Sequence, residues 1–336
     1  MTLEGYANFS NYAVAAATVV LALAWLSYVA EWAFGRRQLG VAAAPGSTTR
    51  TATASAEAHV DGTGGPGGVA TRTGSGADAG ADAGLRSDAA RRIALSLTVL
   101  AWAVLVAAVV ARGLAAQRVP WGNMFEFACA AIAVVLTVYL ILVRLQQVEW
   151  LGGIVTGFGV VVLGSSITYY VPAGPLVPAL HSYWLVIHVA AAMIAGGAFL
   201  VGAGASALYL LKSRAERRTP QTANRVGYIW RLPTTAAMDQ LAYRVHAFAF
   251  PIWTFGALIA GPIWAQYAWG RYWGWDPKEV WAFITWVVYA GYLHARATAG
   301  WKGKGAAVLA LVGFACFLFN FVGVNLFISG LHSYAK

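Results

Sequence analysis

Long apolar runs dominate the hydropathy pattern of the chain. The runs approach or exceed the roughly 18 residues that cross a bilayer as a helix, and they do not alternate as the strands of a membrane barrel would. Unsatisfied backbone polar groups are costly in hydrocarbon, so we expect helical spans. The pattern predicts an all-α polytopic membrane protein with eight spans, at residues 11–34, 93–111, 124–143, 151–170, 183–211, 243–264, 279–295 and 305–328.

The charge distribution predicts how these spans are oriented. The net charge of +10 is typical of nucleic-acid binding, but the positions of the basic residues argue against such a partner. All but five of the 23 Lys and Arg residues fall in alternate loops, which follow the first, third, fifth and seventh spans. By the positive-inside rule these loops are cytoplasmic, and both termini are extracytoplasmic. The exceptions are Arg112, Arg118, Arg271, Lys278 and Lys336.

Composition divides the chain into three parts. The first apolar run follows MTLEGYANFSNY, which has no basic residue, so we expect residues 1–37 to keep a transmembrane helix instead of losing a signal peptide. Ala, Gly, Thr and Ser dominate residues 38–90, which predicts a disordered cytoplasmic linker. Residues 91–336 contain the remaining spans and form the predicted functional core.

An external loop at residues 264–286 is unusually rich in tryptophan. An aromatic belt at the membrane interface accounts for one or two tryptophans per helix end, but not for Gly270 and Gly274 between three of them. Glycines let the backbone approach a flat molecule, and indoles stack on it, so the pattern favours a site for a planar ligand. The loop contains Trp264, Trp269, Trp273, Trp275, Trp281 and Trp286.

The sequence Asp276-Pro277-Lys278-Glu279 has the pattern of a helix N-terminus. Asp is a preferred N-cap, Pro suits the first helical position, and Glu at the third position completes a capping box. The N–H groups at such an end suit a propionate or another anion, which Lys278 could help to bind. Equally, Asp276 and Glu279 are explained as caps alone.

The histidines in the membrane segments lie at two levels. His188, near the outer end of the fifth span, and His332, just beyond the eighth, lie at the level of the tryptophan loop. Two imidazoles beside an aromatic platform are suitable axial ligands for an iron porphyrin. His294 lies near the opposite end of the seventh span, where spacing alone would pair it with His246. His181 precedes His188 by two helical turns and is a further candidate.

Cys129 and Cys316 each lie inside a predicted span and in no CxxC pair. Small packing residues explain them. The alternative is a transmembrane thiol-disulfide oxidoreductase, for which the two thiols would have to meet.

Several strings from residue 93 onward resemble the CcsA/ResC family of the System II cytochrome c maturation pathway, which is defined by a tryptophan-rich WWD motif. They are VPWGNMFEF, SYWLVIHV, YRVHAFAFPIWTFGALIAGPIWA, WGRYWGWDPKEVWAFITW, YLHARATAGWKGKGAA and GVNLFISGLHSYA.

The resemblance implies a haem lyase of the bacterial plasma membrane that works with a ResB/CcsB-like subunit. It would carry haem b to the extracytoplasmic WWD loop and attach it through thioethers to the CxxCH segment of an apocytochrome c, whose cysteines a thioredoxin-like protein keeps reduced. A haem exporter or chaperone without attachment activity is the alternative.

The resemblance also assigns roles to residues. It makes His188, His332 and Asp276 catalytic, with His188 and His332 as iron ligands at the outer site. His294 becomes an iron ligand within the membrane, paired with a histidine of the companion subunit and not with His246. The residues expected to bind haem are His188, His332, His294, Trp269, Trp273, Trp275, Asp276 and Trp281.

Overall fold

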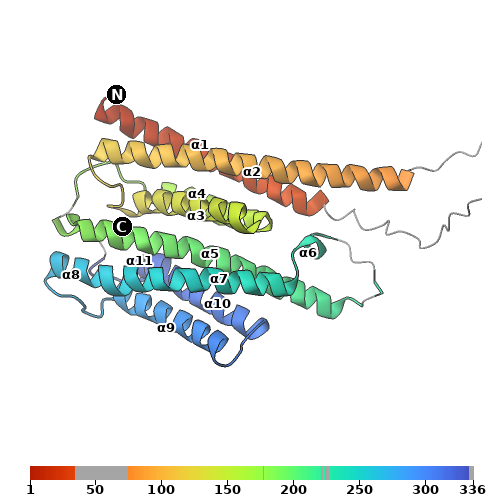
Figure 1. Cartoon of the computed structure of the whole chain (residues 1–336). Helices are drawn as coiled ribbons and strands as arrows, with labels where there is room; N and C mark the ends of the chain where they lie inside the picture. Colours follow the sequence, from red (N-terminus) through yellow and green to blue (C-terminus); the bar gives the residue numbers. More distant parts are fainter. Residues whose placement is uncertain (35–74, 177, 221, 224–226, 333–336) are drawn as a thin grey trace, which may run out of the picture.

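The computed structural model describes residues 1–34, 75–176, 178–220, 222–223 and 227–332. These residues form helices and no strand, as predicted (Figure 1). The α-helices are α1 Leu3–Phe34, α2 Ser75–Ala116, α3 Met124–Gln146, α4 Gly152–Ser166, α5 Tyr183–Arg218, α6 Tyr228–Arg231, α7 Thr235–Trp253, α8 Gly261–Trp269, α9 Pro277–Ala297, α10 Lys304–Leu318 and α11 Val324–Phe327. Short 3₁₀ turns are η2 Glu149–Leu151, η3 Ile167–Tyr169 and η4 Pro178–Leu180, and π-helical turns are η5 Thr254–Ala260 and η6 Phe319–Gly323.

Among the described residues, seven helical segments are long and apolar enough to cross a membrane. The α7, η5 and α8 helices join into one of them, and α10, η6 and α11 into another. The remaining predicted span, residues 279–295, corresponds to α9, which has 21 residues and packs against α10 and α7. Its Trp, Tyr, His and Arg residues make it less apolar than the other seven, although at 1.5 Å per residue it extends for about 31 Å.

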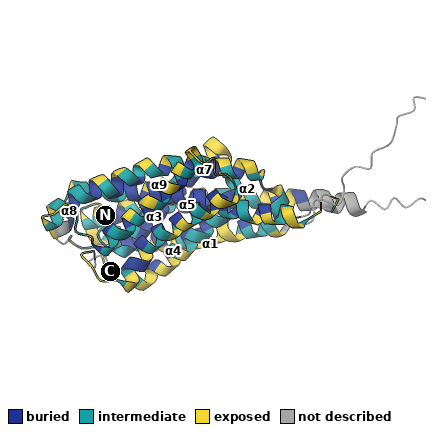
Figure 2. Ribbon diagram, turned by 90° about the horizontal axis from the view of Figure 1, so that it is seen from below, coloured by how far each residue is buried: buried dark blue, intermediate teal, exposed yellow. Residues whose placement is uncertain are grey.

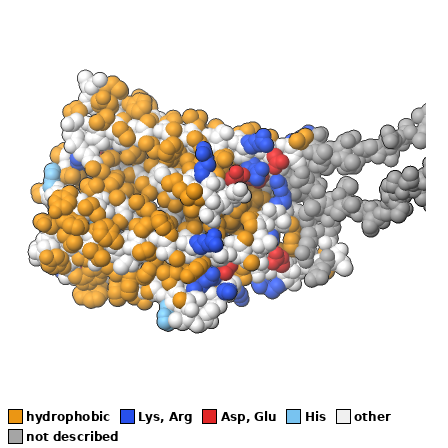
Figure 3. All heavy atoms as spheres, in the orientation of Figure 1, with side chains coloured by type: hydrophobic (Ala, Val, Ile, Leu, Met, Phe, Trp, Pro, Cys, Tyr) orange, Lys and Arg blue, Asp and Glu red, His pale blue; other side chains and the backbone are white. Residues whose placement is uncertain are grey.

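The bundle has two chemically different ends. The start of α1, the end of α8, the start of α9 and the segment after α11 lie together at one end (Figure 1). Lys, Arg, Asp and Glu gather towards the opposite end, and hydrophobic side chains cover most of the remaining surface in this view (Figure 3). Such an exposed apolar surface fits lipid as the solvent. We call the end with the start of α1 and the segment after α11 the terminal end, and the other the charged end.

The expected linker is shorter than predicted. Helix α2 begins at Ser75, so the prediction of disorder is wrong for residues 75–90. The rest of the predicted linker, residues 38–74, lies outside the described residues. Arg231 donates to buried Ser87 and forms an ion pair with Asp88 at 3.7 Å, and Arg91 pairs with Glu149 at 3.3 Å. Because most of the stability of a protein helix comes from tertiary packing, these contacts stabilise the first half of α2.

Helix α5 runs through the centre of the bundle and packs against α7, α3 and α10. Figure 2 shows buried residues mainly in the interior of the bundle and exposed residues mainly at its periphery. The glycines of α5 permit close approach of neighbouring helices, as at Gly202, where an added Cβ would lie 2.4 Å from the ring of His246 on α7. This packing fixes the rotation of α5 and therefore the direction of His188 near its start.

Candidate functional site

A cavity of about 140 Å³ lies at the terminal end, between the ends of α3, α5, α8 and α9 and the segment after α11. We call it the aromatic cavity. Five tryptophans and both outer histidines take part in its lining: Trp121, Trp253, Trp264, Trp269, Trp273, His188 and His332. The structure therefore brings together the histidines and part of the tryptophan loop that the sequence placed at one level.

His188 lies in the second turn of α5, and its Nδ1 is 2.8 Å from the carbonyl oxygen of Gly256. A carbonyl only accepts, so Nδ1 carries the proton and Nε2 bears the lone pair. The same carbonyl accepts from the N–H of Gly261 across the π-helical turn η5. Metal-binding histidines are commonly held in this way through the nitrogen that does not bind the metal. The π turn thus orients His188 as a ligand.

His332 is held in the same tautomer by a carboxylate. Its Nδ1 lies 2.8 Å from Oδ2 of Asp276, whose Oδ1 accepts the N–H of Leu331 at 2.7 Å. Burial lowers the pKa of His332, although the bond to Asp276 acts in the opposite direction. Burial alone would raise the pKa of Asp276, but the hydrogen bonds from His332 and Leu331 outweigh it and lower the pKa. At neutral pH a neutral imidazole therefore faces a carboxylate, with its lone pair on Nε2.

Trp264 connects the two histidines. Its ring is stacked on His188 with centroids 5.9 Å apart, and it also contacts His332 at 5.7 Å. Trp269 completes the cluster, 4.8 Å from Trp264 and 4.9 Å from His332. Trp264 is only 2% exposed and lies at the centre of the site, although it was not among the predicted haem-binding residues. Its place at the start of the tryptophan loop was the signal that could have identified it.

The other predicted tryptophans divide between the cavity and its surroundings. Trp269 and Trp273 line the aromatic cavity. Trp275 is 66% exposed, has a left-handed backbone with φ of 56°, and is not part of the lining. Trp281 packs on Phe319 with centroids 4.3 Å apart, also outside the lining. Direct haem contacts for Trp275 and Trp281 remain predictions that the shape of the cavity does not support.

The capping box at the start of α9 is present as predicted. Oδ2 of Asp276 accepts the N–H of Lys278 at 3.3 Å, and Oε2 of Glu279 accepts those of Gly274 at 2.8 Å and Asp276 at 3.0 Å. The expectation of N–H groups available to an anion here is therefore wrong, because the two carboxylates occupy this end of the helix. The side chain of Lys278 instead lines the aromatic cavity.

The remaining histidines lie elsewhere. His294 is exposed on α9, and His181 is exposed before α5; neither lines the aromatic cavity. His246 is fully buried, with Nδ1 2.6 Å from the carbonyl oxygen of Ala242 and its ring against Tyr292 at 5.1 Å. Residues two positions apart on a helix point in nearly opposite directions, so α9 turns Tyr292 towards His246 and His294 away from it. The pairing of His294 with His246 that spacing alone suggested is absent.

Two buried polar atoms of the cavity lining have no hydrogen-bond partner among the described residues. They are Nε1 of Trp273 and Oδ1 of Asn320. Buried polar atoms without partners are uncommon and call for an explanation such as a ligand. Asn320 was missed by sequence reasoning, although a polar side chain within an apolar span is itself a sign of function.

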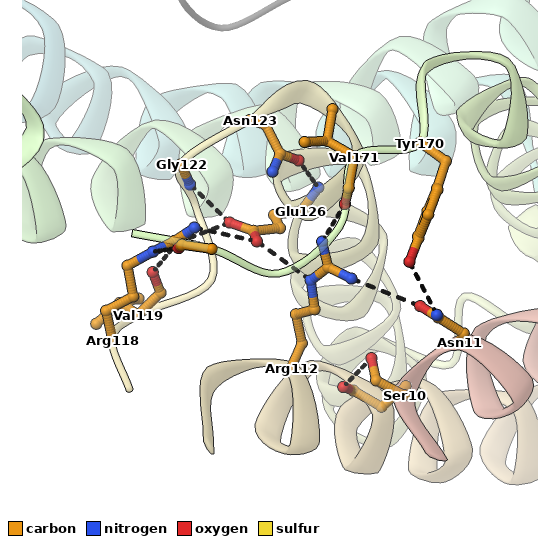
Figure 4. A network of polar contacts seen from close by, with 12 residues as sticks. Ser10, Asn11, Arg112, Arg118, Val119, Gly122, Asn123, Glu126, Tyr170 and Val171 are labelled. Atoms are coloured by element: carbon orange, nitrogen blue, oxygen red, sulfur yellow. Dashed lines mark hydrogen bonds and ion pairs between the residues drawn. The ribbon is translucent and has the colours of Figure 1, made fainter. Parts of the chain in front are cut away.

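A buried ion-pair network supports the wall formed by Trp121, Gly122 and Asn123 (Figure 4). Glu126 is 1% exposed and pairs with Arg112 at 3.2 Å and with Arg118 at 2.8 Å. Its Oε2 also accepts the N–H of Gly122 at 2.9 Å, and Asn123 caps α3 by accepting the N–H of Glu126 at 2.9 Å. The arginines extend the network to the carbonyl oxygens of Val171 and Gly174, so it joins α2 and α3 to the loop before α5.

A second, larger cavity of about 590 Å³ adjoins the first. The two share Met124, Phe127, Ala192 and Phe321 in their linings. The second cavity extends between α3, α4, α5 and α10, and its lining is mostly apolar. It therefore places a mostly apolar space, deeper in the bundle, beside the aromatic cavity.

The two cysteines are free thiols on different helices, with Cys129 buried in α3 and Cys316 half-buried in α10. Helix α3 packs mainly on α5, α4 and α2, and α10 on α9 and α5. This arrangement gives the thiol-disulfide hypothesis no support.

These features define a polytopic α-helical membrane protein with a two-histidine aromatic cavity at one end. The profile of the family described as "Cytochrome C assembly protein" matches residues 91–332, and the chain belongs to this family. The family expected from the sequence motifs is thereby confirmed.

Curated relatives carry the name "Cytochrome c biogenesis protein CcsA". The protein of Parasynechococcus marenigrum is 36% identical over 277 residues, 74% of this chain and 88% of its own length. That of Chlamydomonas reinhardtii is 44% identical over 162 residues, and the match spans 48% of this chain and only 43% of that protein. A solved structure, "Cytochrome c Heme Lyase CcmF", superimposes with a TM-score of 0.59 at 16% identity, covering 96% of this chain and 47% of that one, and so shows a shared fold.

Proposed function

We propose that this chain binds haem b in the aromatic cavity as the substrate of cytochrome c maturation, with His188 and His332 as ligands of the iron. The observation that carries the proposal is the pair of imidazoles, each held through Nδ1 and each with the lone pair on Nε2, around the shared Trp264. The donor set suits the molecule: neutral imidazoles ligate iron, and indoles stack on a porphyrin.

The proposed reaction is attachment of haem to an apocytochrome c by the System II route. The chain's own residues hold and orient the substrate, with His188 and His332 on the iron and Asp276 fixing His332. Each thiolate of a CxxCH segment forms a bond from sulfur to one carbon of a vinyl group, while a proton adds to the other carbon. A thioredoxin-like protein supplies the reduced thiols, and a ResB/CcsB-like subunit completes the enzyme, a holocytochrome c synthase.

The proposed location is the bacterial plasma membrane, with the WWD loop on the extracytoplasmic side. The separation of the charged end from the terminal end supports this orientation. We also propose that His294, which is exposed on α9 and does not line the aromatic cavity, contributes to a second haem site with a histidine of the companion subunit.

Absorption spectra of the complex purified with its partner subunit test the axial ligands. The wild type should show a Soret band and, after dithionite, sharp α and β bands. His188→Ala and His332→Ala should each lower the haem affinity of the outer site by more than about tenfold. Mutation of residues that only support a metal ligand already lowers affinity about 10- to 100-fold. His181→Ala is the matched control, because His181 is exposed and outside the cavity. Spectra of His294→Ala report on the second haem site separately.

Wild-type spectra and normal holocytochrome yield in either outer-histidine variant would refute the assignment. A variant series that affects haem content in parallel with covalent cytochrome yield supports the synthase. Haem loading with no covalent product from the complete complex would favour a haem exporter or chaperone instead.

A further inference from the structure

Lys278 brings a positive charge to the aromatic cavity. It lies in the first turn of α9, and its side chain lines both this cavity and a small adjoining one that Asp276 and His332 also line. Within the described part of the chain, no carboxylate oxygen lies within 4.0 Å of its ammonium group. The charge of Lys278 contributes to the lowered pKa of His332, after the larger effect of burial, which agrees with their closeness.

The two nearby carboxylates are already engaged. Asp276 accepts hydrogen bonds from His332, from the N–H of Leu331 and from that of Lys278. Glu279 accepts the N–H groups of Gly274 and Asp276 through one oxygen. These bonds hold the carboxylates in the capping box and the C-terminal segment, so the lysine faces the cavity without an ion-pair partner from the described protein.

A second donor lies in the same lining, three residues before Asp276. Nε1 of Trp273 is buried and has no hydrogen-bond partner among the described residues. An indole nitrogen only donates, and a lysine ammonium also only donates. Two donors in an otherwise largely apolar cavity, one of them charged, call for an acceptor that carries negative charge.

We propose that Lys278 and Nε1 of Trp273 form a subsite for the carboxylate substituents of the planar ligand, which for haem are the propionates. This inference rests on the proposed function and adds to it how the porphyrin is oriented: the imidazoles fix its plane, and the two donors select the edge that turns towards the start of α9. The subsite makes the cavity selective for an anionic porphyrin over a neutral one.

Comparison of haem with haem dimethyl ester tests the subsite, because the ester keeps the iron and the ring but removes both negative charges. Binding is titrated to the haem-depleted complex with its partner subunit. The wild type should bind haem at least about tenfold more tightly than the ester, the range of one charge-assisted hydrogen bond. Lys278→Met should remove this preference by weakening haem alone, while Lys278→Arg should keep most of it. Trp273→Phe should reduce it in part.

Lys304→Met is the matched control, since Lys304 is exposed at the start of α10, at the charged end. Equal binding of haem and ester by a wild type that binds both tightly would overturn the subsite and leave the proposed function standing. Equal weakening of both porphyrins by Lys278→Met would also overturn it, because that result indicates a structural role. Failure of the wild type to bind either porphyrin would overturn the proposed function, and the subsite with it.

Discussion

Asp276 links three parts of the site through one carboxylate. It caps α9, accepts the N–H of Leu331, and holds Nδ1 of His332 across 56 positions of sequence. Each of these bonds orders a different element, so the residue joins the tryptophan loop to the C-terminal segment. The sequence marked Asp276 as a cap, and only its tertiary contacts show that it also positions a candidate iron ligand.

Replacement of Asp276 by Asn separates these roles, because Asn is as good an N-cap as Asp but carries no charge. We expect Asp276→Asn to keep the fold and to weaken haem binding at the outer site by about 10- to 100-fold, the usual cost of losing a carboxylate that supports a ligating histidine. Haem titration followed by the reduced spectrum measures the effect. Asp239→Asn is the control, since it also replaces a paired carboxylate, but one far from the aromatic cavity. The partner of Asp239 is Arg296, in the last turn of α9. An affinity equal to that of the wild type would remove Asp276 from the ligand assembly.

At the scale of elements, a π-helical turn and a buried ion-pair network shape the cavity. The π turn η5 places Gly256 so that its carbonyl reaches His188, and π-helical turns inside helices are frequent at functional sites. The buried network around Glu126 anchors the start of α3 against α2 and the loop before α5. Neither feature appears in a hydropathy pattern, which predicts that η5 and the start of α3 are parts of ordinary spans.

Glu126→Ala tests the network, because it leaves Arg112 and Arg118 without their shared carboxylate. Breaking a buried ion pair by removing one partner costs about 3 to 5 kcal/mol, so we expect a loss of this order in the free energy of unfolding. Denaturation in detergent micelles, followed by tryptophan fluorescence, gives the value. Glu4→Ala, at an exposed position near the N-terminus, is the control. A variant as stable as the wild type would show that the network does not hold this wall.

At the scale of the whole molecule, the two ends of the bundle predict a single orientation in the membrane. The terminal end carries the tryptophan loop, and in Figure 3 Lys and Arg side chains gather towards the charged end, which the positive-inside rule places in the cytoplasm. The lower apolarity of α9 does not change this conclusion, since α9 packs against α10 and α7.

Single cysteines test the orientation in a background with Cys129 and Cys316 replaced by Ala. Tyr272 is 61% exposed in the loop before α9, and Trp301 is 48% exposed in the loop after it. A membrane-impermeant maleimide should label Tyr272→Cys on intact cells, and Trp301→Cys only after permeabilisation. The reverse pattern would place the tryptophan loop in the cytoplasm and contradict the proposed site of attachment.

The sequence by itself determined the all-helical class and the approximate positions of the membrane segments, the capping box at Asp276 and Glu279, and the level shared by His188, His332 and the tryptophan loop. These features are local. Hydropathy reports how each segment meets lipid, and caps depend on residues three or four apart, so a single chain is enough to read them.

The tertiary structure decided which of these residues meet. Trp264 became the centre of the site, Trp275 and Trp281 lie outside the cavity lining, and the π turn brings Gly256 to His188 across 68 positions of sequence. Helix α2 is likewise joined to the distant Arg231 through Ser87 and Asp88. A side chain's direction follows from the rotation of its helix, which long-range packing fixes and which no local pattern in the sequence contains.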